Sequence, residues 1–485
     1  MKFYLFLGTL FSCFTSVAQS LPIQDAFDTF IELPDLEGAA VSFEAVNMED
    51  EATVLSYNAN MRLAPASTVK LFTTATAYLH LDTSYQPSTH IFFDGVIDSS
   101  GVLQGNIVVK GGGDPSLGSR FFEKEGLESR FLDSWVTQLK KVGLKAVNGS
   151  VIADGSDYGY SGVPDGWSWS DIGNYYGASP SGCVVYDNMI RLRFKTGNDV
   201  GDSTWLISTQ PNIPGYELEN YVSASTLRYD NSYVYGAPYQ NSQFIAGTLP
   251  IGKSSFEVKA SMPDPEFILA FELSTALEKS GVKISLAPKG YRTIKRFYSL
   301  DKVYKKEPTL TFDGKNLSSI AYFTNKNSVN LFAEQIMCWI GEHTMRDAST
   351  KSGVLFTNQF WSTLFKDELF LTDGSGLSRS NAVSSHQFVS MLLYMKNTKY
   401  ASNFRYTLPV VGESGTLARL CKNGPARGRV MAKSGTMNRI KSYAGYVNSI
   451  SGKKIAFSII VNNFSGSSRS LTQHLEKIFN ALAIS

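Results

Sequence analysis

The sequence is poor in the residues that form covalent cross-links and hold metals. It contains 4 cysteines and 5 histidines among 485 residues. No Cys-x-x-Cys pair is present, and the histidines are not spaced as metal ligands. We therefore expect no disulfide framework, no zinc centre, and neither a metal nor an organic cofactor.

The sequence also lacks a large net charge. Its 45 basic and 43 acidic residues give a formal net charge of +2. This balance offers no electrostatic argument for a nucleic acid or an anionic membrane surface as partner. A hydrophobic content of 43% with 18% charged residues is typical of a globular protein. The length predicts more than one domain, and the many aromatic and glycine residues indicate substantial β structure.

Long hydrophobic runs are absent beyond the N-terminus. Lys2 precedes an apolar run at residues 3–14, and the small residues of Ser16-Val17-Ala18 follow it. This pattern predicts a signal peptide at residues 1–18 that is cut after Ala18. Lipidation at Cys13 is a minor alternative. No later stretch is long and apolar enough to form a transmembrane segment, so we expect a soluble mature protein. The signal peptide predicts a periplasmic or otherwise extracytoplasmic location.

Strands are predicted near both ends of the chain. The segment from about residue 22 to residue 56 alternates polar and apolar residues, which indicates two strands joined at residues 47–50. Three further strands form a meander near the C-terminus, at residues 430–434, 440–447 and 454–461. If the first and last strands share one sheet with helices against it, the fold is an α/β sandwich whose terminal segments meet.

The middle of the chain has a different sequence pattern. Short strands and turns alternate, interrupted by predicted helices at residues 128–142 and 266–279. We therefore predict a discontinuous catalytic domain, residues 19–85 plus 300–485. It would be interrupted by a β-rich region of two nested subdomains at residues 86–299.

One short motif suggests nucleophilic chemistry. Pro65 precedes an Ala- and Leu-bearing run and predicts the start of a helix. Residues three apart share one helix face, so Ser67 and Lys70 can bring hydroxyl and amine together. A serine needs an adjacent base at neutral pH, and a lysine with a lowered pKa can supply it.

Two further motifs follow in the order that penicillin-recognising serine enzymes use. They are Ser328-x-Asn330 and Lys433-Ser434-Gly435-Thr436. Each is short, but a chance match of all three in this order is improbable. The first would open a helix and the third would lie on a strand.

With these motifs, the chain resembles the class C low-molecular-mass penicillin-binding proteins, the D-alanyl-D-alanine carboxypeptidase/endopeptidase family. The resemblance covers nearly the whole mature chain. It includes the long insertion between the first two motifs and four shorter stretches: residues 112–115, Trp-x-Trp-x-Asp at 167–171, Tyr-Tyr-Gly-Ala at 175–178, and residues 373–379. It implies an α/β (α+β) penicillin-recognising, β-lactamase/transpeptidase-like domain with an antiparallel sheet flanked by helices. Ser434 departs from the usual threonine but keeps the hydroxyl.

The resemblance implies an acyl-enzyme reaction on peptidoglycan peptides, inhibited by β-lactams. Ser67 would attack the carbonyl of the penultimate D-alanine while Lys70 takes its proton. Ser328 would relay a proton towards the leaving amine. Asn330 would hold the peptide backbone and keep Lys70 oriented.

The third motif would bind the substrate's terminal carboxylate. Lys433 would attract this carboxylate and help to keep Lys70 neutral. The hydroxyls of Ser434 and Thr436, on either side of Gly435, would bind it. The backbone N–H groups of Ser67 and Thr436 would form the oxyanion hole.

Three residues outside the motifs would line a pocket for the diamino acid of the stem peptide. By the same resemblance, these are Asp171, Tyr176 and Arg379. Asp171 would pair with the ammonium group and Arg379 with the carboxylate. An ordinary loop carboxylate, a packed tyrosine and a surface arginine are equally good interpretations.

Two other functions remain open. A β-lactamase shares the three motifs, but one class deacylates with a Glu-x-x-Asn element between the second and third motifs, and none occurs between Ser328 and Lys433. A catalytically silent wall-binding module is the other, although such a protein would commonly have lost a motif residue. The preference between trimming and cross-link cleavage, the diamino acid and the oligomeric state are not determined by these patterns.

Overall fold

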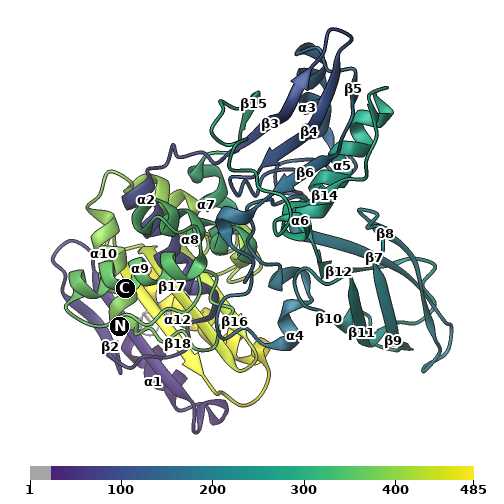
Figure 1. Ribbon diagram of the computed structural model, residues 1–485. Helices are drawn as coiled ribbons and strands as arrows, with labels where there is room; N and C mark the ends of the chain where they lie inside the picture. Colours follow the sequence, from purple (N-terminus) through teal and green to yellow (C-terminus); the bar gives the residue numbers. More distant parts are fainter. Residues whose placement is uncertain (1–22) are drawn as a thin grey trace, which may run out of the picture.

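The computed structural model describes residues 23–485, so the predicted signal peptide and Cys13 lie outside the described residues. Its central sheet has five strands in the order β16–β17–β18–β1–β2 (Figure 1). The strands are β1 (Ala40–Asn47), β2 (Thr53–Tyr57), β16 (Val430–Met437), β17 (Ile440–Asn448) and β18 (Lys454–Asn462). β1 runs antiparallel to β18, with Ala40 opposite Asn462. The predicted pairing of first and last strands in one antiparallel sheet is confirmed.

Helices cover both faces of this sheet. On one face lie α2 (Lys70–Leu81), α7 (Leu317–Lys326), α8 (Asn330–Met345), α9 (Thr350–Phe365), α10 (Ser385–Lys396) and α11 (Ala401–Thr407). On the other face lie α1 (Ile23–Ile31) and α12 (Ser468–Ile484). Alternate residues of β18 serve the two layers: Ile460 packs with the first set and Phe457 with the second. The described chain ends therefore meet on one side of the molecule (Figure 1).

The first described segment corrects one expectation. Residues 23–31 form helix α1 rather than part of an alternating strand region. Ile23, Phe27 and Phe30 are buried, a spacing of three and four residues that matches a helix. The alternation that predicts strands begins only at β1. The two strands themselves and the C-terminal meander occur as predicted.

Three further sheets lie outside the central one (Figure 1), and they include residues 310–313 as well as the region predicted at 86–299. The strands of the seven-stranded sheet are β3 (Ser88–Ile97), β4 (Val102–Lys110), β5 (Ala146–Val147), β6 (Val151–Asp154), β13 (Lys283–Ile284), β14 (Lys289–Gly290) and β15 (Leu310–Asp313). The predicted helices are present as α3 (Arg130–Lys141) and α5 (Pro265–Lys279). A short helix, α6 (Tyr291–Ile294), follows α5.

The other two sheets have three strands each. One is β12–β7–β8, from β7 (Met189–Thr196), β8 (Thr204–Gln210) and β12 (Phe256–Ser261). The other is β10–β11–β9, from β9 (Glu217–Ser225), β10 (Asn231–Tyr235) and β11 (Ser242–Pro250). A single core joins all three sheets, because Val109, Phe194 and Ile245 belong to one buried cluster.

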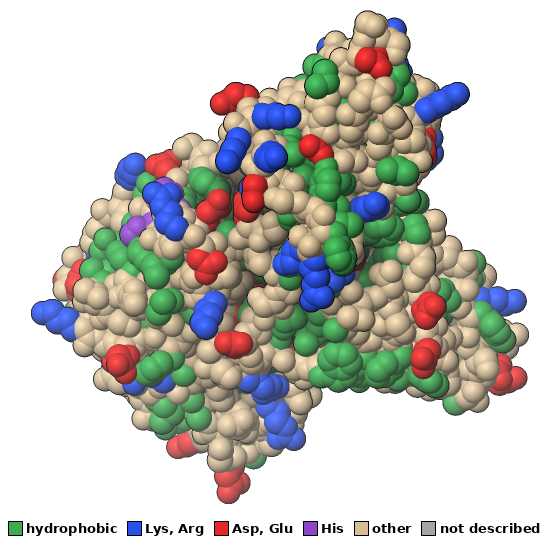
Figure 2. Space-filling model, viewed as in Figure 1, with side chains coloured by type: hydrophobic (Ala, Val, Ile, Leu, Met, Phe, Trp, Pro, Cys, Tyr) green, Lys and Arg blue, Asp and Glu red, His purple; other side chains and the backbone are tan. Residues whose placement is uncertain are grey.

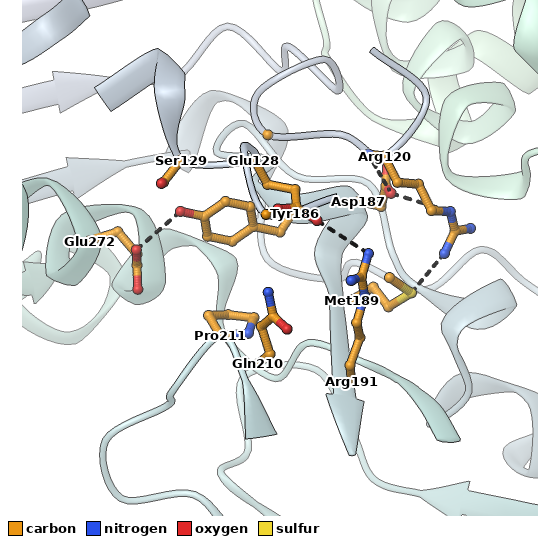
Figure 3. A pocket seen from close by; sticks show the side chains of 12 residues that line it. Arg120, Glu128, Ser129, Tyr186, Asp187, Met189, Arg191, Gln210, Pro211 and Glu272 are labelled. Atoms are coloured by element: carbon orange, nitrogen blue, oxygen red, sulfur yellow. Dashed lines mark hydrogen bonds and ion pairs between the residues drawn. The ribbon is translucent and has the colours of Figure 1, made fainter. Parts of the chain in front are cut away.

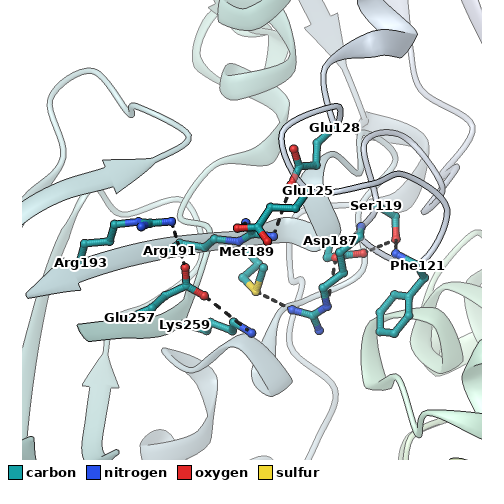
Figure 4. Close-up of polar contacts among 11 residues, drawn as sticks. Ser119, Phe121, Glu125, Glu128, Asp187, Met189, Arg191, Arg193, Glu257 and Lys259 are labelled. Carbon is teal, nitrogen blue, oxygen red and sulfur yellow. Dashed lines mark hydrogen bonds and ion pairs between the residues drawn. The ribbon is translucent and has the colours of Figure 1, made fainter. Parts of the chain in front are cut away.

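A buried charged group holds the inserted region against the catalytic helices. Asp187 accepts hydrogen bonds from Ser119 Oγ at 2.5 Å and from the backbone N–H of Arg120 at 3.3 Å (Figure 4). The Arg120 side chain lies 3.5 Å from the same carboxylate. The next residue of that loop, Phe121, packs against Phe332 of α8. The loop therefore ties the two regions together.

The same group borders a cavity of about 210 Å³ within the inserted region (Figure 3). Tyr186 donates a hydrogen bond across it to Glu272 at 3.0 Å. Arg191 lies 3.4 Å from Glu128 at its other side. No residue of the three motifs lines this cavity.

Candidate active site

The first motif lies where a 3₁₀ turn, Ala66–Val69, runs into α2. Ser67 is in the turn and Lys70 is the first residue of the helix. Lys70 Nζ is 3.0 Å from Ser67 Oγ, so the contact predicted from their spacing is present. Ser67 is only partly buried, whereas the Lys70 side chain is fully buried. The nucleophile can therefore meet a substrate while its neighbouring amine is shielded from water.

The surroundings of Lys70 favour a neutral amine. Besides Ser67, the ammonium group donates to Asn330 Oδ1 at 2.7 Å and to the backbone oxygen of Ser375 at 2.6 Å. None of these acceptors carries a charge. Burial lowers the pKa of Lys70 to about 7, although the carboxylates of Asp373 and Glu334 oppose the shift. Lys70 can thus accept a proton near neutral pH.

The second motif meets the first from the start of α8. Ser328 adopts a left-handed backbone with φ of 60°, which is costly for a residue with a Cβ. Asn330 is the first residue of α8, and its amide joins two parts of the site. Its oxygen accepts from Lys70, while its nitrogen donates to the backbone oxygen of Tyr176 at 2.8 Å.

The third motif lies on β16, which is the edge strand of the central sheet. Lys433 is fully buried and donates to Ser328 Oγ at 2.9 Å and to the backbone oxygen of Ser434 at 2.7 Å. Burial lowers the pKa of Lys433 well below its usual value, and nearby Lys70 lowers it further. Ser434 is partly buried and Thr436 is exposed. Hydroxyls thus face the solvent side while both lysines lie beneath.

Gly435 allows this strand to approach the nucleophile. A Cβ built on Gly435 would lie 2.5 Å from the backbone oxygen of Pro65 and 3.0 Å from the backbone nitrogen of Ser67. It would also lie 2.2 Å from Ser442 Oγ. Only glycine therefore fits this position without displacement of the nucleophile turn.

Two buried carboxylates, to which the sequence patterns assign no role, support the site from behind. Glu334 accepts backbone N–H bonds from Gly374 at 3.0 Å and Ser375 at 2.7 Å. Burial and the neighbouring Asp373 raise the pKa of Glu334. Because Ser375 receives a hydrogen bond from Lys70, Glu334 orients the base through the backbone. Its position four residues after Asn330, on the same helix, is the sequence signal that could have revealed it.

Asp373 holds the same loop. It accepts from the backbone N–H of Gly376 at 2.8 Å and from that of Ser378 at 2.6 Å. The indole of Trp167 donates to it at 2.9 Å. This bond links the loop to the stretch at residues 167–171.

The three residues predicted around the motifs lie near one another. Tyr176 Oη donates to Asp171 at 3.2 Å. Arg379 donates to the backbone oxygen of Asn438 at 2.9 Å, beside the third motif. Burial raises the pKa of Asp171, and the positive charge of Arg379 acts against this shift. Asp171 and Arg379 do not form an ion pair, so each group can meet a ligand.

Within residues 23–485, no three His, Cys, Asp or Glu side chains are grouped as a metal site would require. The described helices include none long and apolar enough to cross a membrane.

Comparison with known proteins places this geometry in a family. Residues 23–479 match the D-Ala-D-Ala carboxypeptidase 3 (S13) family. The chain belongs to this family. It is a serine-type hydrolase of the D-alanyl-D-alanine carboxypeptidase class, and the predicted family and fold are confirmed.

The chain is also similar to a curated relative and shares its fold with two solved structures. A D-alanyl-D-alanine carboxypeptidase of Actinomadura sp. (strain R39) is 28% identical over 93% of this chain and 83% of its own length. The crystal structure of penicillin-binding protein 4 from Haemophilus influenzae superposes with a TM-score of 0.78 at 23% identity, covering 96% of this chain and 100% of that one. A peptidoglycan endopeptidase from Bdellovibrio bacteriovorus gives a TM-score of 0.51 at 13% identity, covering 92% of each chain.

Proposed function

We propose that this family member hydrolyses the D-Ala–D-X bond of peptidoglycan stem peptides through an ester on Ser67. The observation that carries the proposal is the fully buried Lys70, with Nζ 3.0 Å from Ser67 Oγ and a pKa of about 7. A neutral amine at this distance can take the hydroxyl proton as the oxygen attacks.

The oxyanion would form between the nucleophile turn and β16. The backbone N–H groups of Ser67 and Thr436 would stabilise it, and the close approach at Gly435 supports this assignment. Residues 409–411 pair with the start of β16 at residues 430–432, so the substrate backbone would pair with the edge that follows, at the third motif.

The leaving amine would receive a proton by way of Ser328. Its hydroxyl contacts Lys433 at 2.9 Å, so it can pass on a proton that Lys433 replaces. Without substrate, Lys433 lies buried beside a second lysine, which disfavours its charge. A substrate carboxylate bound by Ser434 and Thr436 would favour the charged form of Lys433. Recognition of a terminal carboxylate and readiness to donate a proton would then be coupled.

Asp171, Tyr176 and Arg379 would bind the diamino acid of the donor peptide. The proximity of a carboxylate and a guanidinium without an ion pair suits a side chain that ends in both an ammonium and a carboxylate group. The substrate is an extracytoplasmic polymer, and the predicted signal peptide would deliver the enzyme to that compartment.

The principal test is intact-protein mass spectrometry after brief exposure to benzylpenicillin. We expect a stable adduct of penicillin mass on the wild type and none on Ser67→Ala, because Ser67 would supply the only acylated oxygen. If neither protein is labelled and the drug is intact, the chain is a silent wall-binding module. Rapid drug turnover without an adduct would indicate a β-lactamase.

A second measurement separates the two peptidase activities. Purified monomeric and cross-linked muropeptides are incubated with wild type and Ser67→Ala, and the products are resolved by chromatography. Loss of a terminal D-alanine reports carboxypeptidase activity, and conversion of dimers to monomers reports endopeptidase activity. An absence of both products would contradict the proposal.

A further inference from the structure

The outer face of the sheet β10–β11–β9 carries an unusual number of aromatic side chains. Alternate residues of each strand point inward, and Val222, Val234 and Ile245 are buried in the core of the inserted region. The outward positions hold four aromatic residues: Tyr221, Tyr233, Tyr235 and Phe244. Tyr221 is 66% exposed and Tyr233 is 45% exposed. Figure 2 shows hydrophobic side chains gathered over this part of the molecule.

These rings form a continuous row with Trp169 of α4 (Trp169–Ile172), which is 51% exposed. The ring centroids of Trp169 and Tyr235 are 6.3 Å apart. Tyr235 stacks on Phe244 at 4.7 Å, and Phe244 lies 6.4 Å from Tyr221. Tyr221 donates a hydrogen bond to Glu219 at 2.8 Å, which holds its ring at the far end of the row.

The row begins beside the candidate active site. Trp169 lies two residues before Asp171, which binds Tyr176. The short helix α4 carries both Trp169 and Asp171, and it packs against β10, the strand of Tyr233 and Tyr235. Tyr176 in turn receives a hydrogen bond from Asn330, which contacts Lys70. The aromatic face is therefore continuous with the substrate site.

The polar residues around the rings favour a sugar polymer as the occupant. Outward positions of the same strands carry Glu217, Glu219, Asn231 and Thr248, and none carries a lysine or arginine. Pyranose rings present flat C–H faces surrounded by hydroxyls, so they match exposed aromatic rings flanked by hydrogen-bond acceptors. Exposed apolar patches with a polar rim mark binding sites on soluble proteins.

We propose that the face formed by Trp169, Tyr235, Phe244 and Tyr221 binds the glycan strand that carries the stem peptide. The inference rests on the proposed peptidoglycan substrate, because the row extends outward from that peptide site. Binding along the glycan would keep the enzyme on the polymer while peptides enter the cleft.

The test uses full-length mature protein and glycan strands from which an amidase has removed all stem peptides, coupled to beads so that they sediment. This probe offers no peptide to Ser67, so cosedimentation reports contacts with glycan, and the variants assign these contacts to the aromatic face. Penicillin labelling of the wild type is measured in parallel. Loss of labelling would contradict the proposed function without affecting the glycan result.

We expect the wild type to cosediment with the glycan and Tyr221→Ala to bind about fivefold more weakly, because one exposed ring is lost. Tyr221→Ala/Tyr235→Ala should bind more weakly still. Tyr221→Phe keeps the ring and should bind nearly as the wild type does. Trp205→Ala is the matched control, because Trp205 is 53% exposed but lies on β8 in another sheet. Thermal unfolding of each variant establishes that it is folded.

Three outcomes would overturn the proposal. Equal binding by wild type and the double variant would remove the aromatic face from glycan recognition. Binding only to sacculi that retain their peptides would assign the contact to peptide. Sedimentation equilibrium that shows a dimer, lost in Tyr221→Ala, together with no glycan binding, would assign the face to a second copy of the chain.

Discussion

The candidate active site and the inserted region both bury cationic side chains, but the groups around these cations differ. In the inserted region, the buried or half-buried arginines lie beside carboxylates: Arg120 is 3.5 Å from Asp187, and Arg191 is 3.4 Å from Glu128. In the candidate active site, Lys70 and Lys433 donate only to hydroxyl, amide and backbone oxygens. Among the described residues, neither lysine forms an ion pair.

This difference separates a structural charge from a reactive one. The attraction within a buried ion pair offsets part of the desolvation of both partners and favours their charged forms. A buried lysine with uncharged acceptors loses stability as a cation, so its pKa falls. Glu334 and Asp373 lie near Lys70, but both accept hydrogen bonds from the backbone of residues 374–378 rather than from Lys70. They orient the base while leaving it able to accept a proton.

The largest effect on acylation is expected when Lys70 is replaced by arginine, which cannot lose its proton. Lys70→Arg keeps the positive charge but removes the base, because arginine stays protonated at all working pH values. The second-order rate of acylation by benzylpenicillin should fall at least about a thousandfold. It is measured by the growth of the covalent adduct with time. An acylation rate within tenfold of the wild type would exclude Lys70 as the base.

A larger residue at Gly435 should have the next largest effect, because it would push β16 away from the turn that holds Ser67. In Gly435→Ala, the added methyl group would meet the oxygen of Pro65 at 2.5 Å. Displacement of Ser67 relative to β16 should lower acylation roughly tenfold to a hundredfold. A folded variant, shown by thermal unfolding, that reacts at the wild-type rate would contradict this geometry.

The pH dependence of acylation should reflect Lys70. Since its pKa is about 7, the neutral amine dominates above pH 7 and the cation dominates below it. The acylation rate should therefore rise with pH through about 7 and fall about tenfold per unit below pH 6. Asp373→Asn removes the carboxylate that most strongly raises the pKa of Lys70, so this limb should move to lower pH. A limb at the same pH in Asp373→Asn, or its displacement to higher pH, would refute the electrostatic assignment.

The smallest effect on catalysis is expected for the paired charges. Asp187→Asn leaves the charge of Arg120 without its partner and weakens the bond to Ser119. It should lower the free energy of unfolding by about 2 kcal/mol. The acylation rate and its pH limb should stay as in the wild type, because Asp187 does not contact the three motifs. A shift in the pH dependence of acylation would mean that the charge at Asp187 affects the pKa of Lys70. The two regions would then not be electrostatically independent.

Local patterns predicted the parts of the site that depend on short spacing. The three-residue interval between Ser67 and Lys70 predicted their contact, since the chain turns by about one helical turn over that distance. Alternating residues predicted β1 and β2 and the strand of the third motif. The apolar spacing of the helix at residues 23–31 merges with the alternation of the strand that follows, so the sequence pattern does not separate the two.

Residues that act only through distant contacts could not be predicted in the same way. Glu334 is one residue of an apolar helix until the loop at residues 374–375 folds against it. The row joins Trp169 to strands whose aromatic residues begin at Tyr221, about 50 residues further along the chain. Neither constellation has a fixed sequence interval that a motif could record.

The sequence by itself determined the chemical class of this protein, because the nucleophile, its base and the two further motifs are short, ordered and local. Only the tertiary structure decided that both lysines are buried without a counter-ion, that Glu334 and Asp373 hold the loop which Lys70 contacts, and that an aromatic face extends from the cleft. The physical reason is that hydrogen bonding and apolar spacing along the chain shape its elements locally. Burial, and with it pKa, depends on which distant elements pack together.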